Sequence, residues 1–162
     1  MILRVLEFAS RYRPKLASDL DILSRRLFKA GAAVLLLLGL VHSASLFERL
    51  QPANETEKQL LDLMTNYRFD LVGSHRRMSD LLQGFSASFM VSALGLGVLD
   101  LVLSREGTTL LRRVALINAI WLAAMTALSL RYFFVVPTCI LGVAFLIFAS
   151  AWITLRSAQA AK

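Results

Sequence analysis

The chain alternates long apolar runs with short polar connections. Four runs stand out, at about residues 30–47, 81–103, 114–130 and 137–155. A helix needs roughly 20 apolar residues to cross about 30 Å of hydrocarbon. Backbone groups in lipid must bond within their own segment, and the period of two that a barrel requires is missing. The pattern therefore predicts an all-α integral membrane protein, with four transmembrane helices packed as a bundle.

The apolar runs divide the chain into three parts. Residues 1–29 form a basic segment that is expected in the cytoplasm, residues 30–155 hold the four-helix membrane domain, and residues 156–162 form a short cytoplasmic tail. Leucines in the first part recur at steps of four, three and four residues, which predicts an amphipathic helix on the membrane surface. Pro14 is expected to separate it from a shorter upstream element. These leucines are Leu16, Leu20, Leu23 and Leu27.

The connection between the first and second runs also has helical spacing. Its apolar positions step by four, three and four residues, which predicts an interfacial helix on the outer face of the membrane. Gly73 is expected to end this helix, and Ser74 to cap the second span. The apolar positions are Leu60, Met64, Tyr67 and Leu71.

Composition and charge support a membrane location. Hydrophobic residues make up 57% of the 162 residues, above the 45–50% typical of soluble domains, and the mean hydropathy is +0.63. The net charge of +7 would suggest nucleic acid in a soluble protein. Here the basic residues flank the apolar runs and no stacking motif accompanies them, so nucleic acid is not an expected partner.

The distribution of Lys and Arg predicts the orientation. Twelve of the 18 fall before the first run, between the second and third, or after the fourth, and six fall in the other two connections. Positive charge is enriched on the cytoplasmic side of multi-pass proteins. Both termini are therefore expected in the cytoplasm, with residues 66–77 outside.

Ionisable side chains from three stretches are expected at the same outer face. Such groups are costly near a bilayer, so they are commonly paired or functional, and a purely structural cluster is the alternative. Histidine titrates near neutral pH, which makes His42 and His75 the candidate acid–base groups. The predicted polar cluster comprises His42, Arg68, Asp70, His75 and Arg131.

Small residues mark candidate helix-packing seams, because they let backbones approach closely in lipid. The seams join helices of this chain or receive a partner helix. Asn118 is expected to bond across a seam, and Asp100 to pair with Arg105 or an N-terminal arginine. The seam residues are Gly84, Ser88 and Ser92 in the second span and Ala115, Ala119, Ala123 and Ala127 in the third.

No metal or cofactor site is expected. His42 and His75 are far apart in sequence, and Cys139 is the single cysteine, so ligand spacing for a metal is absent. No nucleophile stands beside a base in the sequence. These patterns disfavour enzymatic chemistry without deciding against it.

Several short motifs stand in order along the chain: Gly39-x-x-His42, Arg68-Phe69-Asp70 with Gly73-Ser74 and Arg76, Gly84-Phe85, and Arg131-Tyr132-Phe133-Phe134 with Pro137. In these motifs the chain resembles a widespread, uncharacterised family of small four-helix bacterial inner-membrane proteins. The resemblance covers roughly residues 27–155, and it implies the fold and the inner-membrane location but no reaction. Two features depart from it: Ser45 stands where a glycine is usual, and the segment "MSDLL" replaces a more aromatic run before Gly84.

A weaker likeness is to membrane-associated glutathione-handling enzymes, which are also small four-helix proteins. The segment "SHRRMSDLLQGF", residues 74–85, is similar to their arginine-rich entry into the second helix. The Arg-x-x-x-Asn-x-x-Glu arrangement of that family is missing here. Enzymes of that family bind a charged thiol cofactor with arginines at the membrane surface. The arginines of this segment are instead expected at the outer face, so no such cofactor is expected here.

Three functions follow as hypotheses. The first is a non-enzymatic membrane protein, either an accessory subunit of a complex or a binder of lipid-like molecules, with lipids, another membrane protein or a second copy as partners. The second is an enzyme acting on a lipophilic substrate at the outer face, with His42 or His75 as acid–base group and Arg68 and Arg131 holding an anionic group. A small transporter is third, since no inverted repeat is visible.

Overall fold

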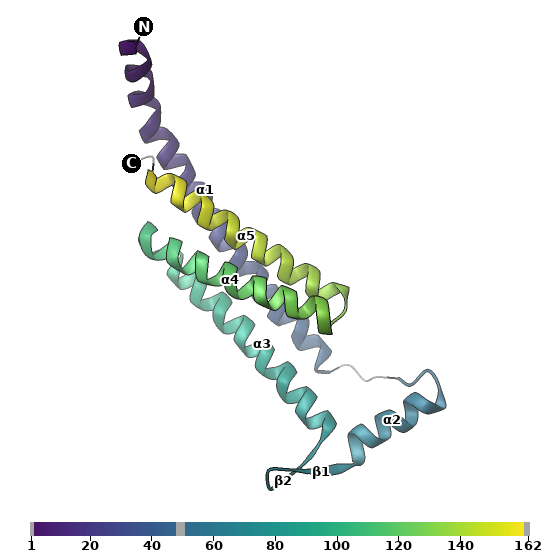
Figure 1. Cartoon of the computed structure of the whole chain (residues 1–162). Coiled ribbons are helices and arrows are strands. Elements are labelled where there is room, and N and C mark those ends of the chain that lie inside the picture. The colour runs from purple at the N-terminus through teal and green to yellow at the C-terminus, as the bar shows by residue number, and fades with distance from the viewer. Residues whose placement is uncertain (1, 48–50, 161–162) are drawn as a thin grey trace. The chain divides into compact units, whose positions relative to one another are not determined.

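The computed structural model describes residues 2–47 and 51–160, with the backbone alone for residues 2–13 and 45. The side chains of the first part of the predicted N-terminal segment, and the last two residues of the predicted tail, lie outside the described residues. The elements in chain order are α1 (Ile2–Ser45), α2 (Glu55–Asn66), β1 (Arg68–Leu71), β2 (Ser74–Arg77), α3 (Met78–Leu103), α4 (Thr108–Tyr132) and α5 (Val135–Ala160) (Figure 1).

The described chain is predominantly helical, as predicted. Four stretches of its helices are long and apolar enough to cross a membrane, which confirms the number of spans expected from the apolar runs. The spans are longer than predicted at most of their ends, because polar residues continue the helices beyond the apolar core. They are Pro14–Ala44, Met78–Leu103, Thr108–Tyr132 and Val135–Ala160.

The chain forms two compact units. The first comprises Met1–Leu36 and Gly95–Lys162, and the second comprises Leu37–Leu94. The boundaries fall inside α1 and inside α3. The first unit therefore contains α4 and α5 with parts of α1 and α3, whereas the second contains α2, the two strands and the remaining parts of α1 and α3.

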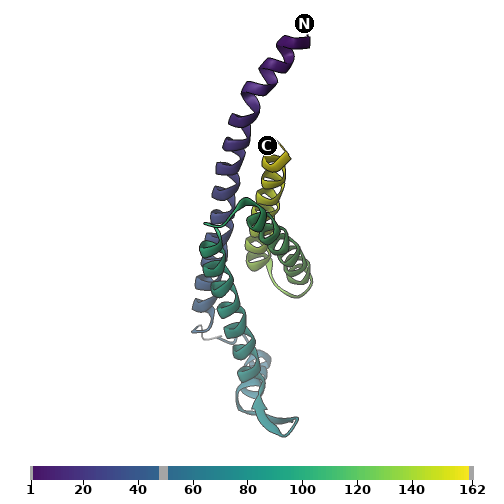
Figure 2. The ribbon, with the colours of Figure 1, turned by 90° about the vertical axis from the view of Figure 1, so that its left-hand side faces the viewer.

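In the first unit, α4 and α5 lie side by side (Figure 2). The buried side chains of α5 recur at steps of three and four residues, the spacing of a helix seam, and they alternate large with small. The small members let the neighbouring backbone approach closely, which is how helices pack in lipid. These residues are Leu141, Ala144, Phe148, Ala151, Leu155 and Ala158.

Helix α1 packs against α5 through two aromatic rings and a glycine. Phe28 and Phe148 are both fully buried, and their rings meet edge to face with centroids 5.3 Å apart. A Cβ atom on Gly31 would lie 2.7 Å from Cε2 of Phe148. The close approach of the two helices therefore depends on the missing side chain at residue 31.

The prediction that Pro14 separates the amphipathic N-terminal segment from a shorter upstream element is wrong for the described chain. Helix α1 continues through Pro14 as one helix (Figure 2). Leu16 and Leu23 of the predicted leucine stripe are exposed, whereas the neighbouring Ala17 and Ser24 are buried, so α1 packs within the described chain through a face beside the leucines. A proline removes one helical hydrogen bond, and the tertiary contacts made further along α1 hold the helix in place despite that loss.

Asp21 and Arg25 of α1 form hydrogen bonds with the turn between α3 and α4 and with the first residue of α4. Arg25 Nη1 donates to the carbonyls of Ser104 at 3.2 Å and Glu106 at 3.0 Å, and its Nε donates to Asp21 Oδ2 at 3.1 Å. Asp21 Oδ1 accepts from the Thr108 hydroxyl at 3.1 Å. Ser104 and Glu106 follow the last residue of α3, Leu103, so Arg25 satisfies two carbonyls of the turn that have no helical partner.

A buried polar pair joins α3 to α4. Asn118 Nδ2 donates to Asp100 Oδ2 at 2.8 Å, and both residues are buried. This confirms that Asn118 bonds across a helix seam. Among the described side chains, the partner of Asp100 is Asn118 and not Arg105 or Arg25, because Arg25 is turned toward the carbonyls of the α3–α4 turn.

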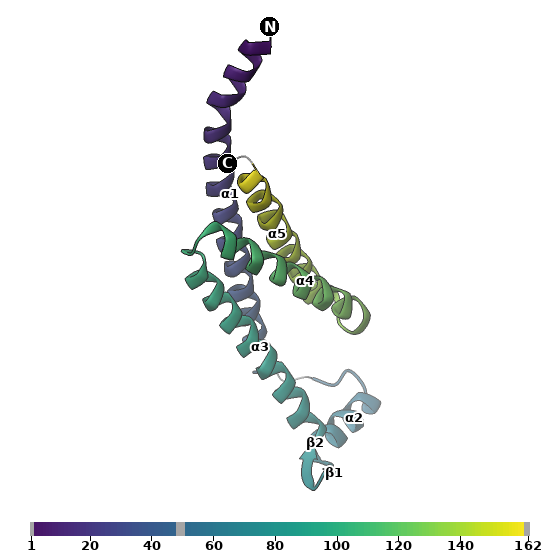
Figure 3. The ribbon, with the colours of Figure 1, turned by 60° about the vertical axis from the view of Figure 1, so that its left-hand side comes forward.

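In the second unit, β1 and β2 form an antiparallel hairpin between α2 and α3 (Figure 3). The predicted helix through Leu71 and the predicted cap at Ser74 are wrong, since α2 ends at Asn66 and α3 begins at Met78. The signal for a strand was the alternation of charged and apolar residues from Arg68 to Leu71, which has a period of two.

The hairpin turns through two residues with positive φ, Val72 at 52° and Gly73 at 79°. Two-residue hairpins favour this arrangement because its twist matches that of the strands, and they favour Asn-Gly in it. A β-branched residue is strained there, at a cost of about 1–3 kcal/mol. Val72 is also 99% exposed, so no packing within the described chain offsets the strain.

We call the hydrogen bonds of Arg25 and Asp21 with the α3–α4 turn and the start of α4 the clasp, and we expect them to contribute measurably to stability. Arg25→Gln removes the cation that donates to both carbonyls of the turn, and it should lower the free energy of unfolding by about 1–3 kcal/mol. Thermal unfolding in detergent, followed by circular dichroism, measures the change. The matched control is Arg26→Gln at the adjacent exposed arginine, and an equal loss in both variants would contradict the clasp.

A second prediction concerns the strained turn. Val72→Asn should stabilise the hairpin by about 1 kcal/mol, because Asn tolerates the left-handed conformation. Amide hydrogen exchange across the two strands should slow about fivefold. Val72→Ala removes the apolar bulk but has little preference for positive φ, so it should gain less. Exchange that is no slower in Val72→Asn would show that the turn is not strained.

Candidate functional site

One face of the hairpin carries ionisable side chains only. Successive residues of a strand point to opposite faces, so cross-strand partners share a face. Arg68 pairs with Arg77, and Asp70 pairs with His75. Three of the predicted cluster residues, Arg68, Asp70 and His75, therefore lie on one face, which we call the polar face. All three are exposed, and none forms an ion pair with another described residue.

Arg77 connects the polar face to the neighbouring helices. Its Nε donates to Asp80 Oδ2 at 3.1 Å, and its Nη1 donates to the carbonyl of Thr65 at 3.4 Å. Its backbone N–H also donates to Asp80 Oδ2, at 3.3 Å. Asp80 is the third residue of α3, where a carboxylate stabilises the unpaired N–H groups of a helix start. The charge of Asp80 is thereby engaged by Arg77.

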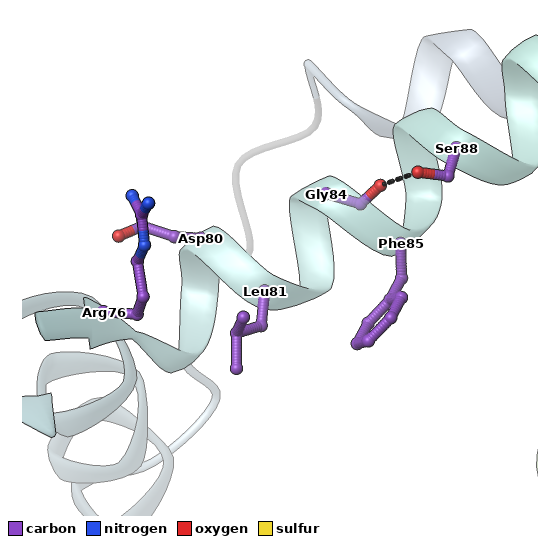
Figure 4. Close-up of a pocket in the computed structure, with 6 residues that line it drawn as sticks. All are labelled: Arg76, Asp80, Leu81, Gly84, Phe85 and Ser88. Carbon is purple, nitrogen blue, oxygen red and sulfur yellow. Dashed lines mark hydrogen bonds between the residues drawn. The ribbon is translucent and has the colours of Figure 1, made fainter. Parts of the chain in front are cut away.

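The opposite face of β2 leads into a shallow, open pocket of about 320 Å³ at the start of α3 (Figure 4). We call it the hairpin pocket. Charged side chains lie at one end of it, and the apolar side chains project from the first turns of α3. The pocket is lined by Arg76, Asp80, Leu81, Gly84, Phe85 and Ser88.

The walls of the hairpin pocket are apolar beyond its charged end. No atom lies within 4 Å of the place where a Cβ of Gly84 would be, so the glycine leaves open space. The Ser88 hydroxyl donates to the Gly84 carbonyl at 2.8 Å, which uses its one donor. Phe85 is 71% exposed beside it. The arrangement suits a molecule with a charged head and an apolar body.

His42 lies in the packing seam between α1 and α3 within the second unit. Its ring is half-buried and meets the ring of Phe89 edge to face, with centroids 5.0 Å apart. One turn earlier, a Cβ on Gly39 would lie 2.7 Å from the side chain of Leu94. The Gly39-x-x-His42 motif therefore serves close helix packing at this point.

Arg131 belongs to the first unit, whereas the other four predicted cluster residues belong to the second. It occupies the last turn of α4, where its guanidinium carbon lies 5.9 Å from the centre of the Tyr132 ring. Both side chains are exposed. This distance fits a cation–π contact, which at an exposed site contributes about 0.5–1 kcal/mol.

The small residues predicted as seams differ in burial. In α4, Ala115 and Ala119 are buried, Ala123 is half-buried and Ala127 is exposed. Four residues advance a helix by about 400°, so a stripe at every fourth position turns about 40° per step and leaves the seam. The three predicted seam residues of α3, Gly84, Ser88 and Ser92, are exposed in the described chain.

Gly84 and Ser88 of the hairpin pocket were predicted from the sequence as seam residues, and Arg76 and Phe85 stood only in the motifs of the family resemblance. None of the lining residues was predicted to form a pocket. The available signal was the spacing of Asp80, Gly84 and Ser88 at every fourth position, directly after an arginine-rich segment. A helix places such residues on one side. Arg76 lies beside these residues because it belongs to strand β2 of the hairpin. The sequence predicted a helix through residues 60–71, and that prediction left no room for the hairpin.

Comparison of the chain with protein-family models, with curated proteins and with solved structures finds no match in any of the three.

Proposed function

We propose that this protein is a multi-pass membrane protein that binds a lipid-like molecule in the hairpin pocket. The observation that carries the proposal is the combination, in one open pocket, of an arginine at the end of β2 with apolar walls on the first turns of α3. Binding sites for amphiphiles need both features, because the head must be paired and the body must leave water.

The location of the pocket along the chain supports a lipid. Helix α3 has 26 residues, which corresponds to roughly 39 Å, against about 30 Å of hydrocarbon. Its ends therefore reach the head-group region. Arg76 comes two residues before α3, so the charged end of the pocket lies where lipid head groups are found and the apolar walls lie deeper.

Helix α2 supports the same interpretation. Leu60 and Leu63 of α2 are 55% and 60% exposed, and Tyr67, which caps its C-terminus, is 62% exposed. The helix lies between two membrane-crossing helices in the sequence, α1 and α3. We therefore place it on the membrane surface, as the expected interfacial helix, with these side chains in the lipid.

The proposal includes the bacterial inner membrane, with both termini in the cytoplasm and the hairpin pocket at the outer face. The excess of Lys and Arg in the N-terminal segment, the α3–α4 turn and the C-terminal tail supports this orientation. The family resemblance supports the choice of membrane.

A binding role is favoured over a catalytic one by the positions of the two histidines. His42 packs against Phe89 in a helix seam, whereas His75 is exposed on the polar face of the hairpin. A general acid or base must lie within hydrogen-bond reach of the reacting group. The hairpin pocket has neither histidine among its lining residues.

Filling the pocket should displace the ligand. Gly84→Leu places a side chain in the open space, so the purified protein should carry severalfold less lipid per chain. Lipids retained in mild detergent are quantified by mass spectrometry. The matched control is Gly95→Leu, since Gly95 is also an exposed α3 glycine with open space around it.

Two results would contradict the proposal. One is wild-type protein that retains no lipid under these conditions. The other is an equal amount of lipid in the Gly84→Leu and Gly95→Leu variants, which would show that the retained lipid lies elsewhere on the protein.

A further inference from the structure

We infer that the hairpin pocket selects an anionic phospholipid, whose phosphate contacts Arg76 and whose acyl chain lies along α3 over Gly84, Ser88 and Ser92. The inference rests on the proposed function, because it names the class of molecule that the pocket takes.

The charge of the pocket is that of Arg76. The one acidic lining residue is Asp80, and its Oδ2 already accepts from Arg77 Nε at 3.1 Å and from the Arg77 backbone N–H at 3.3 Å. Arg76 forms no ion pair with another described residue. Residues 68–80 contain three arginines and two aspartates, so the surroundings remain positive. The pocket therefore attracts an anion.

A phosphate suits Arg76 better than other anions that a membrane offers. The guanidinium group is planar and presents paired N–H donors that match two phosphate oxygens. It stays charged at every physiological pH, and it is less strongly hydrated than an ammonium group. The side chain is exposed at the end of β2, so a head group can reach it from the surface.

Beyond Arg76 along the chain, the exposed small residues of α3 offer few free hydrogen-bond donors to a polar ligand. Gly84, Ser88 and Ser92 are all exposed. The Ser88 and Ser92 hydroxyls donate to the carbonyls four residues earlier, each at 2.8 Å, so their donors are used within the helix. What remains is a strip of small residues bordered by Phe85. A hydrocarbon chain can lie in such a strip without leaving a donor unpaired.

The length of the strip fits one leaflet. Gly84 and Ser92 are eight residues apart, which corresponds to about 12 Å along a helix, and half of a hydrocarbon core is roughly 15 Å. A chain whose phosphate lies at Arg76 therefore follows α3 through most of one leaflet. A soluble phosphate compound would use the charged end alone.

The test compares two lipids on the full-length protein. Native mass spectrometry of detergent-solubilised protein, titrated with phosphatidylglycerol or phosphatidylcholine, gives both affinities. Wild-type protein should prefer phosphatidylglycerol. Arg76→Gln should weaken phosphatidylglycerol binding about tenfold and leave phosphatidylcholine binding unchanged, since one charge-assisted contact is lost. Arg76→Lys keeps the charge and should retain part of the preference.

Two further variants locate the ligand. Arg105→Gln, at an exposed arginine of the α3–α4 turn, is the matched control and should bind both lipids as the wild type does. Ser92→Phe obstructs the strip outside the lining of the pocket, so it should weaken both lipids. Glycerol phosphate is titrated alongside, and it should bind far more weakly than phosphatidylglycerol.

Each outcome has a separate meaning. If Gly84→Leu abolishes binding while Arg76→Gln leaves the lipid preference intact, the inference fails and the proposed function stands. If neither lipid binds wild-type protein, the proposed function fails. If glycerol phosphate binds as tightly as phosphatidylglycerol, or a second protein copy covers the strip in the lipid-free protein, the acyl-chain placement is wrong.

Discussion

Hydrocarbon supplies no hydrogen-bond partner, and this constraint shapes every polar group along the membrane-crossing helices. Most hydroxyls bond to carbonyls of their own helix, as Ser88, Ser92 and Thr154 do. Asn118 and Asp100 instead pair between two helices. These polar side chains are tolerated in apolar helices because each of them is bonded within the protein. The same bonding makes the exposed serine strip of α3 suitable for contact with lipid.

Close helix packing follows from the same environment. Lipid tails are as apolar as leucine, so helices associate through fit and not through water exclusion. The alternation of large and small residues along α5, together with Gly31 beneath Phe148, provides this fit in the first unit. Gly39 has the corresponding role beside Leu94 in the second unit. A glycine inside a helix is costly, and here Gly31 and Gly39 each permit a contact that a larger residue would prevent.

The hairpin lies outside the long apolar helices, and most of its charged side chains are exposed. Arg77 and Asp80 bond to each other and stabilise the start of α3, which leaves Arg76 available on the opposite face of β2. Successive residues of a strand point to opposite faces. Arg77 therefore has the structural role, and Arg76, on the other face, is the candidate binding residue. A helix through these residues would have separated them by about 100° and would not have produced the same division.

The sequence by itself determined the number and approximate extent of the membrane-crossing helices, because twenty or so apolar residues in lipid have one stable backbone conformation. It also indicated that Asn118 bonds across a seam. It did not reveal the hairpin, since the apolar residues from Leu60 to Leu71 fit a helical period and a strand is stabilised by its partner, not by local spacing. The continuation of α1 through Pro14, the choice of Asn118 as the partner of Asp100 and the position of Arg76 beside Gly84 were decided by tertiary structure. Each depends on contacts between residues distant in sequence, whose geometry no local pattern contains.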